Sequence, residues 1–399
     1  MTDKKPSRLI LPPSAGSPLS RRRMIKLTGM GALGLAAGGS LLAACGDDDD
    51  DTSDAAGGST TTAAAGGGGT PVDRVKAHWV YIGPPDDNGW TQTHDQGRLF
   101  AQNALGDAVE TSFTPNIAFD ASTTQLFQQL VDDGNQIIFA NTEYSTLMTE
   151  VADANPDVKF VECNGHHFTA NCFGYYMAHE ITAYLLGIAA GHLSPNGKLG
   201  YIGAFPSATL YNDVNGMLLG ARTVNPDATM NVVQINSFFD PPGAAQAAEA
   251  LLSQGVDFLF GVMDEPTFLE IAEEAGVWTG YWNLAIPDSA PTRYTNNFNL
   301  DAWGPFYQEQ LQAVLDGTWA APSEVVLLDC PLDEWGPEVP QEVQDAVAEA
   351  AAAIASGELS VYTGPLVDNT GAERLAAGET LTSLQAYSID YAIEGVTGA

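Results

Sequence analysis

A loop near the start of the folded sequence gathers side chains suited to binding a ligand. An apolar run ends at Ile82, loop residues 83–89 follow with the sequence GPPDDNG, and a helix pattern begins near residue 91. In open α/β sheets, ligands bind where a strand ends and a helix N-terminus begins. Carboxylates and amides hydrogen-bond to the edge of a flat ring, and aromatic side chains stack on its face. The residues predicted to bind from this loop and helix are Asp87, Gly89, Trp90 and His94.

Further polar and aromatic residues follow later apolar runs, where other strands are expected to end. The carboxyl ends of parallel strands meet at one edge of a sheet, so these side chains are expected to face one cleft. The additional predicted ligand-binding residues are Asn141, Glu143, Asn164, Phe205, Phe238, Asp264, Trp282 and Asn283.

Structural roles remain open at several positions. Asp120 and Asp240 each precede a helix pattern and suit an N-cap, which accepts a hydrogen bond from the first helical turn. Phe239 can be a core residue, and His94 can be a buried structural side chain. Trp90 is harder to explain in this way, because a glycine-containing loop built only to turn does not need an indole.

The same residues do not form a catalytic pattern. His94, Glu143 and Asp264 have side chains suited to acid–base chemistry, but catalysis needs a nucleophile or base with an orienting partner. The sequence has no Ser-His-Asp arrangement, metal-ligand spacing, Gly-x-Ser-x-Gly turn, phosphate loop or dinucleotide-binding glycine motif. We therefore expect a binding protein rather than an enzyme, without cofactor or metal.

Three cysteines lie in the part of the chain that is expected to fold. Cys163 ends an apolar run, Cys172 begins the next one, and a short loop separates them. Because adjacent strand ends can approach each other, a Cys163–Cys172 disulfide is predicted, which leaves Cys330 as a buried thiol. Metal binding with His166 and His167 is the alternative, but the ligand spacing does not support a closed site.

An internal repeat relates two parts of the chain. The tripeptide at 81–83 (YIG) recurs at 201–203, and the dipeptide at 119–120 (FD) recurs at 239–240, each 120 positions later. The segment at 130–139 (LVDDG, then IIF) matches 251–260 (LLSQG, then FLF) at an offset of 121. Three matches in order at nearly one offset indicate two similar lobes.

Both halves alternate strand and helix patterns. Strands are predicted at 75–82, 136–140, 158–163, 198–203, 230–235, 256–260 and 359–362, and helices at 90–105, 120–134, 144–154, 211–223, 240–253, 266–275, 303–316 and 341–356. Strands separated by helices of this length predict parallel sheets. We expect an α/β fold with two doubly wound parallel-sheet lobes and a cleft between them. The first lobe is predicted to contain 73–185 with about 295–320, and the second 186–294 with about 321–399.

The N-terminal region is typical of an export signal. Residues 20–26 (SRRRMIK) have a twin-arginine pattern, and an apolar run leads to Leu42-Ala43-Ala44-Cys45. This pattern predicts a lipoprotein signal peptide over 1–44, with lipidation at Cys45. A transmembrane anchor and an ordinary signal with a chance cysteine are the alternatives. Residues 45–72 are acidic and then rich in Ser, Thr, Ala and Gly, which predicts a disordered tether.

The charge of the chain excludes one class of partner. With 50 acidic and 15 basic residues, the formal net charge is -35. Phosphate recognition requires a basic patch, so nucleic acid is not expected as a partner. Solubility or adaptation to salt explains the acidity more simply than a dedicated cation-binding surface.

Several motifs carry a family resemblance. The loop at 89–98 (GWTQTHDQGR) resembles the first-loop motif of the basic membrane lipoprotein (BMP/PnrA-like) substrate-binding proteins. Residues 155–160 (NPDVKF), 183–191 (AYLLGIAAG), 237–241 (SFFDP) and 303–307 (WGPFY) also resemble this family, in the expected order over about 75–399. The resemblance implies a type I periplasmic-binding-protein fold, the permease subunits of an ABC importer as partners, and purine nucleosides or nucleobases as ligands. It implies an extracytoplasmic protein that is lipid-anchored to the bacterial cell membrane, and we expect a monomer.

The resemblance places purine contacts on Asp87, Trp90 and Phe205, with Phe238 as a further candidate. Nucleoside-binding members hold the ribose with a second-lobe Asp and a late Lys, whereas this chain has Tyr-Trp-Asn at 281–283 and, between Arg293 and the C-terminus, only Arg374 as a basic residue. An adenine-like free base is therefore the first expectation, and a purine nucleoside the second. A receptor lipoprotein for a membrane signalling partner and a binder of another small planar ligand remain alternatives.

Overall fold

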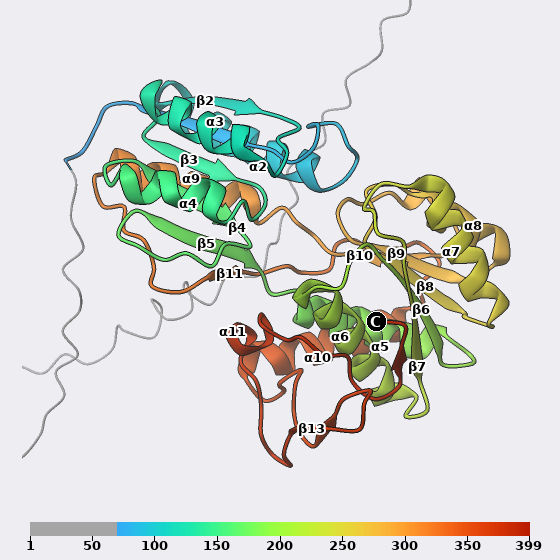
Figure 1. Ribbon diagram of the computed structural model, residues 1–399. Coiled ribbons are helices and arrows are strands. Elements are labelled where there is room, and N and C mark those ends of the chain that lie inside the picture. The colour runs from blue at the N-terminus through green and yellow to red at the C-terminus, as the bar shows by residue number, and fades with distance from the viewer. Residues whose placement is uncertain (1–69) are drawn as a thin grey trace, which may run out of the picture. The chain divides into compact units, whose positions relative to one another are not determined.

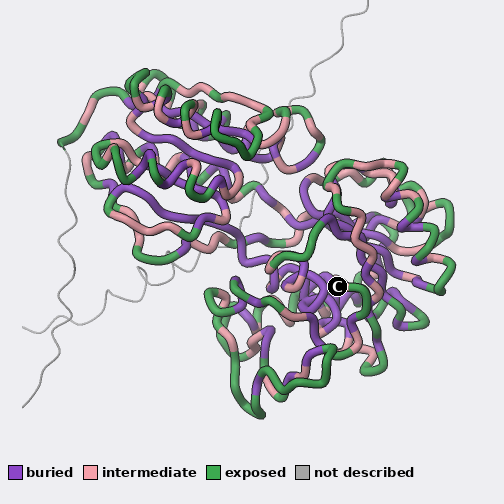
Figure 2. Tube along the Cα trace, in the orientation of Figure 1, coloured by how far each residue is buried: buried purple, intermediate pink, exposed green. Residues whose placement is uncertain are grey.

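The computed structural model describes residues 70–399, and these residues belong to one compact unit. They form two lobes, each built on a six-stranded parallel sheet with helices packed against it (Figure 1). Buried strands lie at the centre of each lobe, while exposed residues follow the outer surfaces of the helices (Figure 2). The predicted α/β fold with two parallel-sheet lobes is confirmed.

The first sheet has the strand order β11-β5-β4-β3-β1-β2. Its strands are β1 (Val75–Val80), β2 (Val109–Thr114), β3 (Ile137–Ala140), β4 (Lys159–Cys163), β5 (Cys172–Met177) and β11 (Val326–Leu328). Its helices are α2 (Trp90–Leu105), α3 (Ala121–Asp132), α4 (Thr146–Ala154) and α9 (Trp303–Leu315), with a short 3₁₀ turn at Gly106–Ala108. The inner strands β3 and β5 are buried along their whole length, as expected for parallel strands that are covered on both faces.

The second sheet has the strand order β10-β9-β8-β6-β7-β14. Its strands are β6 (Lys198–Gly203), β7 (Thr229–Gln234), β8 (Phe258–Gly261), β9 (Trp278–Tyr281), β10 (Tyr294–Asn297) and β14 (Val396–Thr397). The helices of this half are α5 (His179–Leu193), α6 (Ala208–Val224), α7 (Pro241–Ser253), α8 (Thr267–Ala275) and α10 (Gln341–Ser356), with a 3₁₀ turn at Pro287–Ser289. In both sheets the first strand of the repeat, β1 or β6, pairs in parallel with the next two strands along the chain.

The chain crosses between the lobes three times, and two crossings differ from the predicted boundaries. Strand β10 pairs with β9 in the second sheet, although residues from about 295 were predicted in the first lobe. Strand β11 pairs with β5 in the first sheet, although residues from about 321 were predicted in the second lobe. Helix α5 packs closely against α6, so the first crossing comes directly after β5. The sequence repeat covers neither β10 nor β11 and could not place these edge strands.

Glycines allow α5 and α6 to touch along their backbones. A Cβ atom at Gly187 would lie 2.1 Å from the Met217 carbonyl oxygen, and one at Gly220 would lie 2.0 Å from that of Tyr184. A larger residue at either position would force the helices apart, because non-bonded atoms cannot approach so closely. This tight crossing holds α6, whose first residues, Thr209 and Leu210, line the cleft described below.

The C-terminal segment folds back onto the second lobe. It contains β12 (Leu366–Val367), β13 (Glu373–Leu375) and α11 (Ser383–Ala386), and the strand predicted at 359–362 does not form. Two buried amides of α6 hold this segment: Asn212 Nδ2 donates to the Ala386 carbonyl oxygen at 2.9 Å, and Asn215 Nδ2 donates to that of Tyr391 at 2.9 Å. The segment is therefore anchored by side-chain amides, and at its end β14 pairs in parallel with β7.

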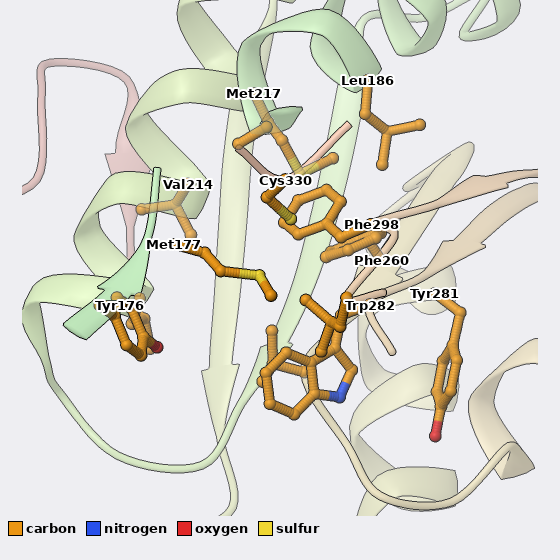
Figure 3. Packing of buried hydrophobic residues seen from close by; sticks show 14 of the residues in the cluster. Tyr176, Met177, Leu186, Val214, Met217, Phe260, Tyr281, Trp282, Phe298 and Cys330 are labelled. Carbon is orange, nitrogen blue, oxygen red and sulfur yellow. The ribbon is translucent and has the colours of Figure 1, made fainter. Parts of the chain in front are cut away.

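The predicted disulfide is wrong. Strands β4 and β5 are parallel neighbours, with Cys163 opposite Tyr175 and Cys172 opposite Phe160. The end of one strand and the start of the next therefore lie at opposite edges of the sheet, and both cysteines are free and buried. Cys330 is a buried free thiol, as predicted, in the same apolar cluster as Met217 and Phe298 (Figure 3).

The predicted signal peptide, the lipidation site Cys45 and the tether up to residue 69 lie outside the described residues. Within residues 70–399, no helix combines the length and the apolar character that crossing a bilayer requires.

Candidate ligand-binding cleft

A cleft of about 970 Å³ lies where strands of both lobes end. First-lobe residues that follow β1, β3 and β4 line it, together with second-lobe residues that follow β6, β7, β8 and β9. Seven of the predicted ligand-binding residues are in this lining: Asp87, Trp90, Asn164, Phe205, Phe238, Asp264 and Trp282. The other five, Gly89, His94, Asn141, Glu143 and Asn283, are not.

Asp87 builds the first-lobe loop. Its carboxylate accepts backbone hydrogen bonds from Gly89, Thr91 and Gln92, at 2.9, 2.9 and 3.0 Å. These N–H groups belong to the loop and to the first turn of α2, where no intrahelical partner exists. A carboxylate at this position also stabilises the helix through its dipole. Asp87 therefore holds the loop that presents Trp90, and it reaches the cleft wall itself.

Asp264 joins the two lobes at the base of the cleft. Its Oδ1 atom accepts the Trp90 backbone N–H at 3.0 Å and the Asn283 side-chain amide at 3.1 Å. Burial, followed by the negative charge of Asp87, raises the pKa of Asp264 to about 7. A Cβ atom at Gly89 would lie 2.1 Å from Asp264 Oδ1, so only glycine permits this approach. Gly89 and Asn283 thus act next to the cleft, through Asp264.

Two tryptophans from opposite lobes form the floor of the cleft. The rings of Trp90 and Trp282 stack with their centroids 5.5 Å apart and their planes within 7°. Each indole N–H is already bonded, Trp90 to the Asn141 carbonyl oxygen at 2.7 Å and Trp282 to that of Met263 at 3.0 Å. The two rings contact each other and leave no space for a ligand between them. Because Trp282 is only 4 % exposed and Trp90 is partly exposed, Trp90 offers most of the apolar surface.

His94 lies beneath this floor and not in the cleft wall. It is fully buried, its Nδ1 atom is 2.6 Å from the Tyr307 hydroxyl, and its ring stacks on Trp303 at 4.4 Å. Burial lowers the pKa of His94 well below its usual value, which keeps the ring neutral. The helical pattern could not distinguish the face of α2 that meets the cleft from the face that meets α9.

Asn141 and Glu143 also lie outside the lining. Asn141 is fully buried, and its Oδ1 atom accepts the Ile82 backbone N–H at 2.8 Å, which ties the loop after β1 to the loop after β3. Glu143 neighbours Thr142, which does line the cleft. The loop after β3 was therefore predicted correctly to reach the cleft, but it is Thr142, between these two residues, that lines the cleft.

A buried carboxyl supports the first-lobe loops. Glu162, at the end of β4, accepts the backbone N–H groups of Tyr144 and Ser145 with one oxygen, at 2.7 and 3.0 Å. Burial raises the pKa of Glu162 to about 8. Glu162 was not among the predicted residues, because it lies within a strand, directly after Phe160 and Val161, and gives no loop signal.

Asn164 of the first lobe is hydrogen-bonded to a residue of the second lobe. The Tyr387 hydroxyl, in the C-terminal segment, donates to Asn164 Oδ1 at 2.7 Å. The Tyr176 hydroxyl of β5 is 2.9 Å from Thr209 Oγ1 in α6. Both Asn164 and Thr209 line the cleft. These two hydrogen bonds between the lobes fix the polar rim of the cleft on the side where β5 leads into α5.

The second lobe contributes most of the aromatic wall. Phe205 and Phe238 are each 45 % exposed, and their ring centroids are 5.8 Å apart. Phe239 and, from the first lobe, Phe119 also line the cleft. Both are exposed rather than in the core. Asp120 and Asp240 cap α3 and α7, which confirms the N-cap interpretation. The repeat contained the signal for Phe119, but a sequence cannot distinguish a core phenylalanine from one at a cleft.

The charges of the lining restrict the ligand. Three carboxylic acids line the cleft, Asp86, Asp87 and Asp264, whereas no lysine, arginine or histidine does so among residues 70–399. An anionic ligand would meet like charges with no cation to compensate them. The cleft therefore disfavours an anion and suits a neutral or cationic ligand with a broad apolar face and hydrogen-bonding groups at its edge.

Comparisons with known proteins agree on one family. The sequence model described as "ABC transporter substrate-binding protein PnrA-like" matches residues 74–277. A purine-binding protein of Brucella abortus is 35 % identical over 81 % of this chain and 93 % of its own length. A putative ABC transporter glucose-binding protein of Haloferax volcanii is 35 % identical over 76 % of this chain and 78 % of its own.

Solved structures show the same fold. An ABC transporter solute-binding protein from Aeropyrum pernix aligns with a TM-score of 0.61 at 17 % identity, over 71 % of this chain and 92 % of that one. Another from Conexibacter woesei aligns with a TM-score of 0.57 at 21 % identity, over 71 % of this chain and 97 % of that one. The expected periplasmic-binding-protein fold is thereby confirmed.

Proposed function

Because this chain belongs to the PnrA-like family of ABC transporter substrate-binding proteins, we propose that it captures a neutral purine by closure of its two lobes. An adenine-like base is the first candidate, and a purine nucleoside the second. The family is one of binding proteins, so the chain is not an enzyme. Its ligand is a small molecule that it passes to permease subunits, and it works outside the cytoplasm.

The combination of aromatic surface and acidic edge in one cleft carries this proposal. The partly exposed indole of Trp90 and the exposed ring of Phe205 offer flat surfaces. Base–aromatic stacking contributes about 1–3 kcal/mol for each base. Asp264 offers a carboxyl at the bottom, where a ring N–H or amino group of a purine would donate to it. The relative from Brucella abortus is described as purine-binding, which supports the same ligand class.

The proposed ligand contacts are narrower than the predicted set. We propose Trp90, Phe205, Phe238, Asp264 and Asn164 as direct contacts. Asp87, Gly89, Asn141, Asn283 and Glu162 are proposed to hold these contacts in place through the hydrogen bonds and close approaches described above.

Lipid anchoring is part of the proposal. We propose that Cys45 is lipidated after removal of residues 1–44, and that the acidic segment that follows it tethers the lobes to the membrane surface. Metabolic labelling with a fatty acid tests this, since Cys45→Ala would abolish the label while leaving purine binding unchanged.

A sugar is the alternative to a purine, because the relative from Haloferax volcanii is described as glucose-binding. Aromatic rings beside carboxylates also fit a sugar, whose apolar face stacks while its hydroxyls donate hydrogen bonds. Titration calorimetry of the purified full chain with adenine, guanine, hypoxanthine, adenosine, guanosine and glucose separates the candidates. Binding of adenine or another purine supports the proposal, and binding of glucose alone would overturn it.

A further inference from the structure

Two loops at equivalent positions of the repeat have the same local design. Asn116 and Asn236 both adopt positive φ angles, 59° and 57°. Three residues later each loop presents a phenylalanine, and the next residue is an aspartate that caps a helix. Asparagine is among the few residues other than glycine that tolerate this backbone region. The shared conformation places Phe119 and Phe239 at corresponding points on the two lobes.

Both phenylalanines are exposed although they line the cleft. Phe119 is 58 % exposed and Phe239 is 64 % exposed, more than Phe205 or Phe238 at 45 %. Exposing an aromatic ring to water is unfavourable, and an exposed apolar patch in a groove marks a binding surface. Phe119 is also the one phenylalanine that the first lobe contributes to the lining, as far as residues 70–399 are concerned.

The inner aromatic residues pack on one another, whereas Phe119 lies beside Tyr144, with 5.1 Å between the ring centroids. Trp90 and Trp282 stack on each other, and the ring of Phe238 lies edge-on to Phe205, at an interplanar angle of 67°. A flat ligand that rests on these inner rings still has an outward side. Further residues are needed to exclude water from that side.

We infer that Phe119 and Phe239 form an outer aromatic pair that covers the outward side of the bound ligand when the lobes close. This inference rests on the proposed function. Because the two rings come from different lobes, they meet the same ligand only in the closed state. They therefore slow release of the ligand and leave its entry into the open cleft unchanged.

Release kinetics test this role. The full chain carrying Phe119→Ala, Phe239→Ala or both is mixed with adenine, guanine or adenosine in a stopped-flow instrument that follows tryptophan fluorescence. Each single substitution is expected to raise the dissociation rate constant at least about 5-fold, with the association rate constant unchanged. Because both rings cover one ligand, the increase in the dissociation rate constant of the double variant is expected to be smaller than the product of the two single increases.

Two controls isolate the effect of the rings. Phe113→Ala removes a phenylalanine that is 37 % exposed on the edge strand β2, away from the cleft, and is expected to leave both rate constants unchanged. Phe239→Tyr keeps the ring and is expected to restore slow release. Thermal unfolding of every variant establishes that it is folded.

The possible results separate this inference from the proposed function. Purine binding by the wild type, with dissociation within twofold of it in both single variants, would overturn the inference and leave the proposed function standing. A wild type that binds glucose but no purine would overturn the proposed function, and the same release experiment with glucose would then decide the inference. A wild type that binds neither would overturn both.

Discussion

The two lobes share a scaffold but contribute different chemistry to the cleft. The first lobe provides mainly polar groups, with Asp86, Asn88, Thr142 and Asn164 at its strand ends. The second lobe provides an apolar wall of phenylalanines together with Leu210 and Val262. The repeat kept β1 and β6, the capped helices and the positive-φ asparagines, while the loop after the first strand changed from DDNGW to AFPS.

This difference indicates how the work of recognition is divided. A wall of hydrogen-bonding groups opposite a wall of rings selects a ligand that has an edge and a face. Neither lobe alone distinguishes such a ligand from a simple polar or apolar one. Trp90 and Phe119 in the first lobe and Asp264 in the second depart from this division, and a hydrogen bond joins Trp90 to Asp264. In the proposed site, selectivity and lobe contact would therefore depend on the same few atoms.

The largest expected effect comes from disturbing the contact between the lobes at Gly89 and Asp264. Gly89→Ala would place a methyl group 2.1 Å from Asp264 Oδ1 and force the lobes to shift at the floor. We expect a loss of about 1–3 kcal/mol of ligand binding free energy, the usual cost of overpacking, measured by calorimetry. In an Asp264→Gly background all three obstructing side-chain atoms, including Cβ at 2.8 Å, are gone, so the same substitution should then cost little. Equal costs in the two backgrounds would contradict a steric origin.

Trp90→Ala compares the aromatic contributions of the two lobes. We expect it to cost roughly 1–3 kcal/mol of binding free energy, because a stacking surface and part of the floor are lost. Phe205→Ala, from the second lobe, is expected to cost about 1 kcal/mol, because its ring is one of several in that wall. Unchanged affinity in a folded Trp90 variant would make this residue purely structural and would place all stacking in the second lobe.

The pH dependence of stability tests the two buried carboxyl groups, Glu162 in the first lobe and Asp264 in the second. The folded-state pKa values of Glu162 and Asp264, about 8 and about 7, lie above their usual values of 4.5 and 3.8. Between these limits the folded protein holds protons that the unfolded chain has lost, so the free energy of unfolding falls as pH rises. We expect the melting temperature to be higher at pH 5 than at pH 8.

Substitution assigns this pH dependence to the two lobes. Glu162→Gln and Asp264→Asn should each flatten the pH dependence of the melting temperature, with a change of about 2 °C for every kcal/mol removed. Glu162→Gln should leave more of the ligand affinity than Asp264→Asn does, because only Asp264 lines the cleft. A melting temperature that rises between pH 5 and pH 8 would contradict the assignment for both residues.

The smallest effect concerns salt, which should act outside the cleft. With a formal net charge of -35, the chain repels itself, and screening shortens from about 10 Å at 0.1 M salt to about 3 Å at 1 M. We expect added potassium chloride to raise the melting temperature and to leave the affinity for a neutral ligand within about twofold. A steep fall in affinity with salt would indicate a charged ligand and would contradict the division of chemistry between the lobes.

The sequence predicted the scaffold well, because periodicity and the repeat are local signals. Helix α2 over 90–105 and strand β6 over 198–203 were predicted with the observed bounds. Strand β2 was missed, because it is a half-exposed edge strand whose polar residues resemble a loop. The disulfide prediction failed, because a pair of adjacent apolar runs does not show whether their strands are parallel or antiparallel.

The site was predicted less completely than the fold. The strand ends that face the cleft followed from topology, and they led to Trp90, Asp264 and Phe205, which line the cleft. The direction in which each side chain points depends on packing between elements that are distant in sequence. His94 points into the contact between α2 and α9, and Phe119 points into the cleft, yet nothing in the residues near them distinguishes these outcomes.

The stacked tryptophans give the protein an optical property. Two indoles held 5.5 Å apart with nearly parallel planes couple their electronic transitions, and the coupling falls steeply with separation. Trp90 belongs to one lobe and Trp282 to the other, so the circular dichroism of the pair exists only while the lobes are in contact at the floor. The protein thus contains its own unlabelled reporter of lobe separation, readable in solution before any ligand has been identified.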